Sequence, residues 1–295
     1  MAQIEFLEKN IMFSKSRKKL IDAFKSKVRL TIKEGGYTQT FMPFDKTAND
    51  YIIKHTKLKY PECDSGLPVP PKGLRAGYEE EADEYIKNSK TDVGNMLKIL
   101  ESSDFKIEGH MKILDFGCST GRMVRSLKPY AKTCEIWGTD VNADHIYWNN
   151  QYLNPPFKFA TTTFNPHLPF EDKYFNLIYS GSVFTHIDNF IESWLLELKR
   201  ILADSGRLYI TIHDNHTLEI FEKNKKIALS EYFHNHDLFD EAKKDFDFFV
   251  FNRAKSPQVF FDLEYFKKLI DPMFEILSVN YESYGYQTGI LLKRK

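Results

Sequence analysis

The stretch KILDFGCSTG, residues 112–121, decides the fold of this chain. Its first half is a short apolar run around Asp115, which is typical of a buried strand. Its second half is a turn of small residues, and segment 122–130 then has a helical pattern. Strand, turn and helix together predict the opening of a nucleotide-binding βα unit, because small residues let the backbone approach a ligand and helix-start N–H groups attract its polar end. A turn that only connects strand to helix is the alternative for this element alone.

The order of acidic and small residues in this stretch distinguishes between cofactors. A dinucleotide fingerprint is G-x-G-x-x-G, whereas this chain has D-x-G-x-S-x-G, formed by Asp115, Gly117, Ser119 and Gly121. A carboxylate two residues before the first glycine repels a pyrophosphate and suits a cationic ammonium group. The pattern therefore favours S-adenosylmethionine over NAD. Cys118, inside the turn, is interpreted as a small apolar filler rather than a nucleophile.

A second acidic strand end follows. The stretch EIWGTD, residues 135–140, predicts a strand that ends in Asp140, close to the spacing at which an acidic residue binds ribose hydroxyls. The alternative role for Asp140 is an ordinary helix cap before the helical pattern of 142–150. With both strands in register, cofactor binding is the better prediction.

These blocks resemble a known family. Residues 112–213 look like a class I S-adenosylmethionine-dependent methyltransferase of the small-molecule type. The resemblance rests on ILDFGCSTGR (113–122), IWGTD (136–140), LPFEDKYFNLIYSGSVFTHI (168–187) and ELKRILADSGRLYITIHD (197–214). It implies ribose binding by the second block, and a fourth strand with the active-site edge in the third. It also implies a helix, a glycine turn and the fifth strand in the fourth block. Ser119 is one departure, since many members have glycine there.

The lead-in to the core carries a second resemblance. GLPVPP (66–71) followed by LRAGY (74–78) is similar to the lead-in of some bacterial methyltransferases found with surface-polysaccharide genes. In such proteins this segment packs over the cofactor mouth, so Arg75 and Tyr78 could touch the carboxylate end of the cofactor. A linker that only wraps the edge of the sheet is the equal alternative.

The fold class expected from these features is α/β. We predict a Rossmann-like, seven-stranded, mostly parallel sheet with an antiparallel last strand, plus a helical N-terminal extension. Residues 1–90 would form this extension and a Pro/Gly linker, and residues 91–295 the methyltransferase domain. An insertion at about 214–261, rich in aromatic and charged residues, would be a lid or substrate wall. Its alternatives are a homodimer contact or local packing.

The predicted cofactor site combines several strand ends. In open α/β sheets ligands bind beyond the carboxyl ends of the strands, which places the end of strand 174–180 against the methionine moiety. The residue that contacts adenine is ambiguous among three neighbours, Thr162, Thr163 and Phe164; core packing is the alternative for Phe164. The cofactor-binding residues predicted are Asp115, Gly117, Cys118, Ser119, Gly121, Asp140, Val141, Thr163, Phe164, Ser180, Gly181 and Val183.

Two histidines are candidate general bases. His213 lies at the carboxyl end of the fifth strand beside Asp214, which could orient the imidazole. His186 follows the fourth strand closely enough to face a substrate. The alternatives for His186 are a helix cap or a hydrogen bond to a backbone carbonyl. His213 is the better candidate by position.

Composition argues against several classes of protein. The 295 residues carry no formal net charge, so specific binding to DNA or long RNA is disfavoured. No apolar run approaches the 18 residues of a membrane span, and the start does not resemble a signal peptide. Cys63, Cys118 and Cys134 lack metal-type spacing and suit reduced thiols in the cytoplasm, and we expect no metal.

The expected activity is methyl transfer from S-adenosylmethionine to a small molecule or a sugar, with O-methylation favoured over N-methylation. A sulfonium makes its methyl group electrophilic, so the protein mainly has to align a nucleophile. Two other classes stay open: a catalytically silent binding protein with this fold, and an NAD(P)-dependent oxidoreductase.

Overall fold

The computed structural model describes residues 39–43, 51–55, 66–76, 78, 81–236, 239–242, 245–253 and 256–295. The chain divides into two compact units, residues 1–61 with 69–78, and residues 62–68 with 79–295. In the first unit, β1 (Gln39–Pro43) pairs antiparallel with β2 (Tyr51–His55), and a short 3-10 helix, η1, spans Lys72–Leu74. The helical pattern expected around residues 16–28 lies outside the described residues.

The second unit is built on a seven-stranded sheet with the strand order β10-β11-β7-β6-β3-β4-β5. Its strands are β3 (Lys112–Phe116), β4 (Glu135–Asp140), β5 (Lys158–Thr161), β6 (Phe175–Ser180), β7 (Leu202–Ile212), β10 (Phe274–Tyr284) and β11 (Gln287–Arg294). Strands β5, β4, β3, β6 and β7 are parallel, and β11 runs antiparallel to both of its neighbours. The predicted sheet is thereby confirmed, including its antiparallel last strand.

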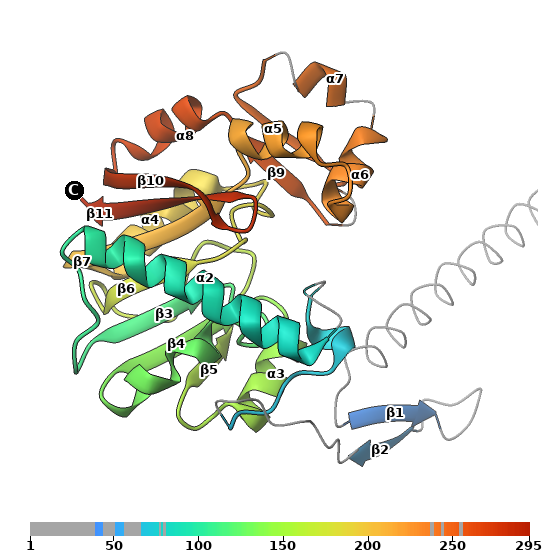
Figure 1. The fold of residues 1–295 in the computed structure, drawn as a ribbon. Helices are drawn as coiled ribbons and strands as arrows, with labels where there is room; N and C mark the ends of the chain where they lie inside the picture. The colour runs from blue at the N-terminus through green and yellow to red at the C-terminus, as the bar shows by residue number, and fades with distance from the viewer. Residues whose placement is uncertain are drawn as a thin grey trace, which may run out of the picture. The chain divides into compact units, whose positions relative to one another are not determined.

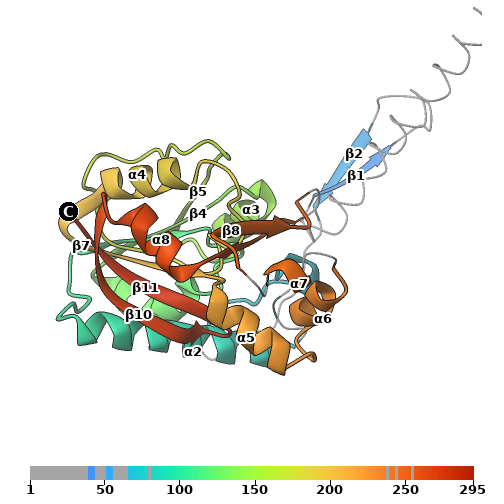
Figure 2. The same ribbon diagram turned by 90° about the horizontal axis from the view of Figure 1, so that it is seen from above.

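Helices cover both faces of the sheet. They are α2 (Ala82–Ser102), η2 (Val124–Lys132), α3 (Ala143–Tyr152), α4 (Ile191–Ile201) and α8 (Leu263–Ile270). Helix α2 runs along one face, whereas α4 and α8 lie on the other (Figures 1 and 2). Residue 90, the expected domain boundary, falls inside α2.

Two local features differ from the sequence prediction. The helix expected from residue 122 begins at Val124 and is a 3-10 helix with Pro129 inside it; proline has no N–H to continue an α-helical ladder. The turn expected at 204–206 lies within β7. Leu202 pairs with Phe175 of β6, and the next paired residue of β7 is Arg207, opposite Leu177. The extra residues form an irregularity in the strand, and the strand continues beyond it.

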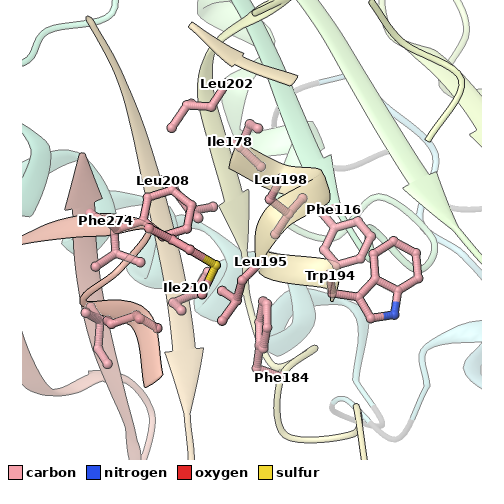
Figure 3. Close-up of a cluster of buried hydrophobic side chains, with 14 of the residues drawn as sticks. Phe116, Ile178, Phe184, Trp194, Leu195, Leu198, Leu202, Leu208, Ile210 and Phe274 are labelled. Carbon is pink, nitrogen blue, oxygen red and sulfur yellow. The ribbon is translucent and has the colours of Figure 1, made fainter. Parts of the chain in front are cut away.

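The main core fills the space between the sheet and the helices α4 and α8. Its side chains come from α4, from α8 and from strands with continuous apolar runs, as expected for strands buried on both faces. Figure 3 shows Phe116 against Trp194 of α4, and Phe184 beside Leu195. This core holds the central strands in place, so their carboxyl ends form a fixed edge.

The insertion after β7 has its own elements and its own core. It contains α5 (Asn215–Lys223), α6 (Ala228–His234), α7 (Phe239–Ala242), β8 (Phe248–Phe251) and β9 (Gln258–Phe261). Strands β8 and β9 pair antiparallel outside the large sheet, and the helices α5, α6 and α7 gather at one end of it (Figure 1). A second hydrophobic cluster, which we call the insertion core, is made of Leu218, Phe221, Phe233, Ala242, Phe251 and Phe260.

Candidate cofactor and acceptor site

The turn after β3 has a left-handed backbone at three positions. The φ angles are 79° at Gly117, 48° at Ser119 and 72° at Gly121. A Cβ atom on Gly117 would lie 2.2 Å from Cγ2 of Val183, so no larger residue fits there without movement of the neighbouring loop. This turn therefore brings bare backbone against Val183, in the loop after β6.

Asp140, at the end of β4, connects this turn to the start of α3 by hydrogen bonds. Its Oδ2 accepts the N–H of Ser119 at 2.8 Å, and its Oδ1 accepts the N–H of Asn142 at 2.8 Å. Helix α3 is capped by the side chain of Asn142, so Asp140 is not the cap. Each carboxylate oxygen keeps a further lone pair for a ligand hydroxyl. Val141, the next residue, is exposed.

Asp115 is the buried acid of the site. Burial raises the pKa of its carboxyl to about 8, and the charge of Asp140 adds to the rise. Tyr179 and Arg122 act in the opposite direction, through a hydrogen bond and a positive charge. The carboxyl group is therefore mostly neutral at pH 7 without a ligand, and a cation placed beside it would favour its charged form.

Cys118 and Asn149 pack behind the turn. Asn149 Nδ2 donates to the Ser119 carbonyl at 2.7 Å. Cys118 is buried, and a Cβ atom on Gly138 would lie 2.7 Å from its sulfur. Burial raises the pKa of the Cys118 thiol, which keeps it protonated. A protonated, buried thiol fits the predicted role as a filler.

The end of β6 forms the opposite wall. Ser180 is buried, and its hydroxyl has no hydrogen-bond partner in the described part of the chain. A Cβ atom on Gly181 would lie 2.8 Å from both Met123 Sδ and Tyr284 Cε2. The predicted residues Gly117, Gly181 and Val183 thus converge, although they come from two different strand ends.

Sequence reasoning missed a polar group beside this wall. Arg122 donates to Asp92 of α2 at 2.6 Å and to the hydroxyl of Tyr284, at the end of β10. Arg122 was visible in the first matching block, but its two partners carry no local signal. Tyr284 lies 162 positions from Arg122 in the chain. Their side chains therefore complete the site through the fold alone.

The loop after β5 leaves an aromatic ring on the surface. Phe164 is 81% exposed, so it is not a core residue. Thr163 uses its hydroxyl to accept the N–H of Asn165 at 3.2 Å, and Thr162 is buried. Of these three neighbours, only Phe164 offers a flat apolar face to solvent or to a ligand.

His213 is enclosed by aromatic rings. Its ring centroid lies 4.7 Å from that of Phe260 and 5.7 Å from that of Tyr286, and the residue is 2% exposed. Burial, with a smaller contribution from the neighbouring His186, lowers the pKa of His213 to about 3. Neither ring nitrogen forms a hydrogen bond of normal geometry within the described residues. The imidazole is therefore neutral at pH 7 and a weak base, and both of its nitrogens are buried.

His186 and Asp214 are engaged in local contacts. Nδ1 of His186 lies 2.7 Å from the carbonyl oxygen of Pro257, to which it donates in the matching tautomer, and this leaves Nε2 as an acceptor. Burial lowers the pKa of His186. Asp214 caps α5 by accepting the N–H of Thr217 at 3.2 Å and forms no hydrogen bond to either histidine within the described residues. The structure thus gives Asp214 a capping contact where orientation of an imidazole was predicted.

Two searches of the described residues gave no candidates. No group of three or more histidine, cysteine or acidic side chains there could hold a metal ion. No helix in those parts of the chain is long and apolar enough to cross a membrane.

The sequence itself matches a known family. Residues 88–259 match the family described as a methyltransferase domain. The chain belongs to this methyltransferase family. The match covers both acidic strand ends, the end of β6 and most of the insertion. S-adenosylmethionine is accordingly the cofactor, as the pattern around Asp115 predicted.

Solved structures show the same fold at low sequence identity. The PH0226 protein from Pyrococcus horikoshii OT3 is 18% identical, with a TM-score of 0.55, over 73% of this chain and 93% of that one. An S-adenosylmethionine-dependent methyltransferase from Clostridium acetobutylicum ATCC 824 is 15% identical, with a TM-score of 0.50, over 70% and 92%. No curated protein sequence matches the chain.

Proposed function

We propose that this methyltransferase acts on a small molecule or a sugar, with an oxygen nucleophile favoured over nitrogen. The observation that carries the proposal is the pair of carboxylates, Asp115 and Asp140, at the ends of β3 and β4 around a left-handed glycine turn. The Asp115 carboxylate suits an ammonium group, and the Asp140 carboxylate suits ribose hydroxyls. The cation beside this edge, Arg122, is paired with Asp92, and the proposed reaction depends mainly on alignment of the nucleophile.

The residues of the site have separate proposed roles. The cofactor supplies an electrophilic methyl group on a sulfonium. Asp115 would bind its amino group, Asp140 its ribose, and Phe164 would stack on adenine, with Val141 and Thr163 beside it. The backbone at Gly181 and Val183 would contact the methionine moiety. The backbone at Gly181 is closely packed, since a Cβ atom there would meet Met123 and Tyr284.

For the acceptor, we propose that a neutral imidazole receives or orients the hydroxyl proton. His213 is neutral at physiological pH, since its pKa is about 3. A base this weak accepts a hydrogen bond well but removes a proton poorly before the methyl group moves. His186, which is more exposed than His213, offers Nε2 as a second acceptor, although desolvation lowers the pKa of this histidine as well. We place the insertion, residues 214–261, as the wall that encloses the acceptor, and residues 1–90 as an extension and linker before the domain.

The unpaired, buried thiols of Cys118 and Cys134 support a cytoplasmic location. A catalytically silent binding protein is the second candidate function. It is favoured by one observation: both nitrogens of His213 are enclosed by aromatic rings rather than placed beside an orienting carboxylate.

The deciding experiment is calorimetric titration with S-adenosylmethionine, S-adenosylhomocysteine and NADH. We expect binding of both sulfur compounds and none of NADH; binding of NADH alone would overturn the proposal. A screen of sugars and small phenols with labelled S-adenosylmethionine then separates the enzyme from the silent protein. In that assay His213→Ala should slow turnover far more than it weakens cofactor binding. Equal, small effects on both would limit His213 to a structural role.

A further inference from the structure

Three side chains form a closed ring of hydrogen bonds at the ends of β6, β7 and β11. The N–H of Ser182 donates to Oγ1 of Thr211 at 2.7 Å, and that hydroxyl donates to Oε1 of Gln287 at 2.7 Å. Nε2 of Gln287 donates back to Oγ of Ser182 at 2.8 Å. The ring thus joins a loop residue to two strands through both ends of one amide group.

The ring of hydrogen bonds is buried. Thr211 is fully buried and Gln287 is 4% exposed, so each lost hydrogen bond would leave a polar group without water. None of these residues belongs to the main core or to the insertion core. A buried amide whose hydrogen bonds are all satisfied mainly fixes the conformation of the residues around it, because each of its hydrogen bonds is directional.

The ring holds a strained residue. Ser182 has a φ angle of 59°, a left-handed conformation that is unfavourable for a residue with a side chain. Such a conformation persists only where the surroundings enforce it, and it is concentrated at ligand sites. Its backbone N–H and its hydroxyl are both fixed by the ring, so Thr211 and Gln287 supply that enforcement.

Ser182 sits between the two contacts that define the wall of the site. The residue before it, Gly181, approaches Tyr284, and the residue after it, Val183, approaches Gly117. Rotation of the backbone at Ser182 would therefore move both contacts at once. No other residue in the described loop 181–190 is tied to β7 and β11 by side-chain hydrogen bonds.

We infer that Gln287 is a positioning residue: through Ser182 it sets the backbone that faces the sulfonium end of the cofactor. The inference rests on the proposed placement of the cofactor against Gly181 and Val183. It predicts that Gln287 contributes to the distinction between S-adenosylmethionine, which carries the charged sulfonium and its methyl group, and S-adenosylhomocysteine, which carries neither.

The test compares the affinities of these two compounds in variants of the full chain. Gln287→Leu removes both polar ends of the amide at similar volume, and Thr211→Val removes only the hydroxyl that bridges the ring. We expect the Kd for S-adenosylmethionine to rise about 5- to 10-fold, the equivalent of one hydrogen bond, with the Kd for S-adenosylhomocysteine changing by less than about 2-fold. The double variant should lose no more than the stronger single variant, because both break one ring.

Tyr209→Phe is the matched control. It removes a buried hydrogen bond of 2.9 Å between β7 and β10, from Tyr209 to Ser283, in the same sheet but without contact to Ser182. It should lower the melting temperature while leaving the ratio of the two affinities unchanged. If Gln287→Leu does not fold, Thr211→Val carries the same test.

An unchanged affinity ratio in both folded variants overturns the inference and leaves the proposed function standing. Failure of the unaltered protein to bind either compound overturns the proposed function, and the inference with it. The two failures are therefore distinguishable in one set of titrations.

Discussion

The two halves of the candidate site are built in different ways. In the cofactor half, Asp140 holds Ser119 across 21 positions of the chain, within two successive βα units. In the acceptor half, which begins at the loop between the proposed sulfonium position and the acceptor, Gln287 reaches Ser182 across 105 positions, and His186 reaches Pro257 across 71. One half is a local motif on a turn, and the other is an assembly of distant segments. A local motif keeps one ligand fixed, whereas the distant segments can change separately, which suits a site that must recognise a particular acceptor.

The hydrophobic cores follow the same division. The cofactor half stands on the main core, whereas the insertion packs most of its buried rings into a core of its own and contributes only Phe261 to the main core as a buried ring. Phe260 stacks on Phe249 with an interplanar angle of 3° and on Phe233 with an angle of 16°. His213 touches this aromatic group through Phe260. The acceptor half is therefore stabilised by packing that the cofactor half does not need.

The largest expected effect is a loss of stability, and it tests whether the insertion core and the main core unfold separately. Phe233→Ala removes a fully buried ring from the insertion core and should cost about 3–5 kcal/mol there. We expect hydrogen exchange to accelerate in α5, α6 and β9, with the affinity for S-adenosylmethionine nearly unchanged. Phe266→Ala is the matched variant in the main core and should accelerate exchange throughout the sheet. A loss of cofactor affinity in Phe233→Ala equal to its loss of stability would show that the halves are one cooperative unit.

The second prediction concerns the turn after β3. Gly117→Ala combines a left-handed φ with a clash against Val183, and should destabilise the protein by about 2–4 kcal/mol and abolish measurable cofactor binding. Gly94→Ala, in α2, has no atom within 4 Å of the new Cβ and should stabilise by about 0.5–1 kcal/mol. Urea denaturation and calorimetry measure both. If Gly117→Ala changes neither the stability nor the cofactor affinity, the loop after β6 must move readily to make room for the new Cβ atom.

The third prediction concerns the carboxylate that ties the two βα units together. Asp140→Ala leaves the N–H groups of Ser119 and Asn142 without their acceptor and removes the proposed ribose contact. We expect the affinity for S-adenosylmethionine to fall about 10- to 100-fold, equivalent to two charge-assisted hydrogen bonds. Asp204→Ala, which breaks an exposed ion pair with Lys173 at the far end of β7, is the control and should leave affinity unchanged. Equal affinities in Asp140→Ala and the unaltered protein would remove the ribose role.

The smallest expected effect is a pH dependence. Because burial raises the pKa of Asp115 to about 8, its neutral form is favoured by the fold; the stability it contributes is full below pH 3.8 and is lost as the pH rises through about 8. Binding a cation requires the charged form. The affinity for S-adenosylmethionine should therefore rise from pH 6 to pH 8, by at most about 10-fold per pH unit.

Asp115→Asn should flatten this profile, since the amide does not titrate in that range. Titrations in buffers of different ionisation enthalpy should also show release of a proton from the unaltered protein near pH 7. A flat profile in the unaltered protein would mean that Asp115 stays neutral when the cofactor binds.

The comparison also explains what the sequence could predict. The turn of small residues, the strand ends at Asp115 and Asp140, and the mostly parallel sheet with its antiparallel last strand were predicted from short patterns and a family resemblance, and each is present in the structure. Tyr284 and Gln287 could not be predicted, because their partners lie far away in the chain and no spacing links them. The enclosure of His213 was equally invisible, since the rings of Phe260 and Tyr286 reach it from β9 and from the turn before β11.

The position of Gln287 in chain order has a consequence for biosynthesis. Strand β11, which carries it, follows every other described segment of the site, and it is inserted between β7 and β10. A growing polypeptide can form the glycine turn and Asp140 early, but it lacks the amide that fixes Ser182 until β11 has left the ribosome. The amide that fixes Ser182 and the interior of the sheet are therefore completed together, by the strand that comes last among the described segments.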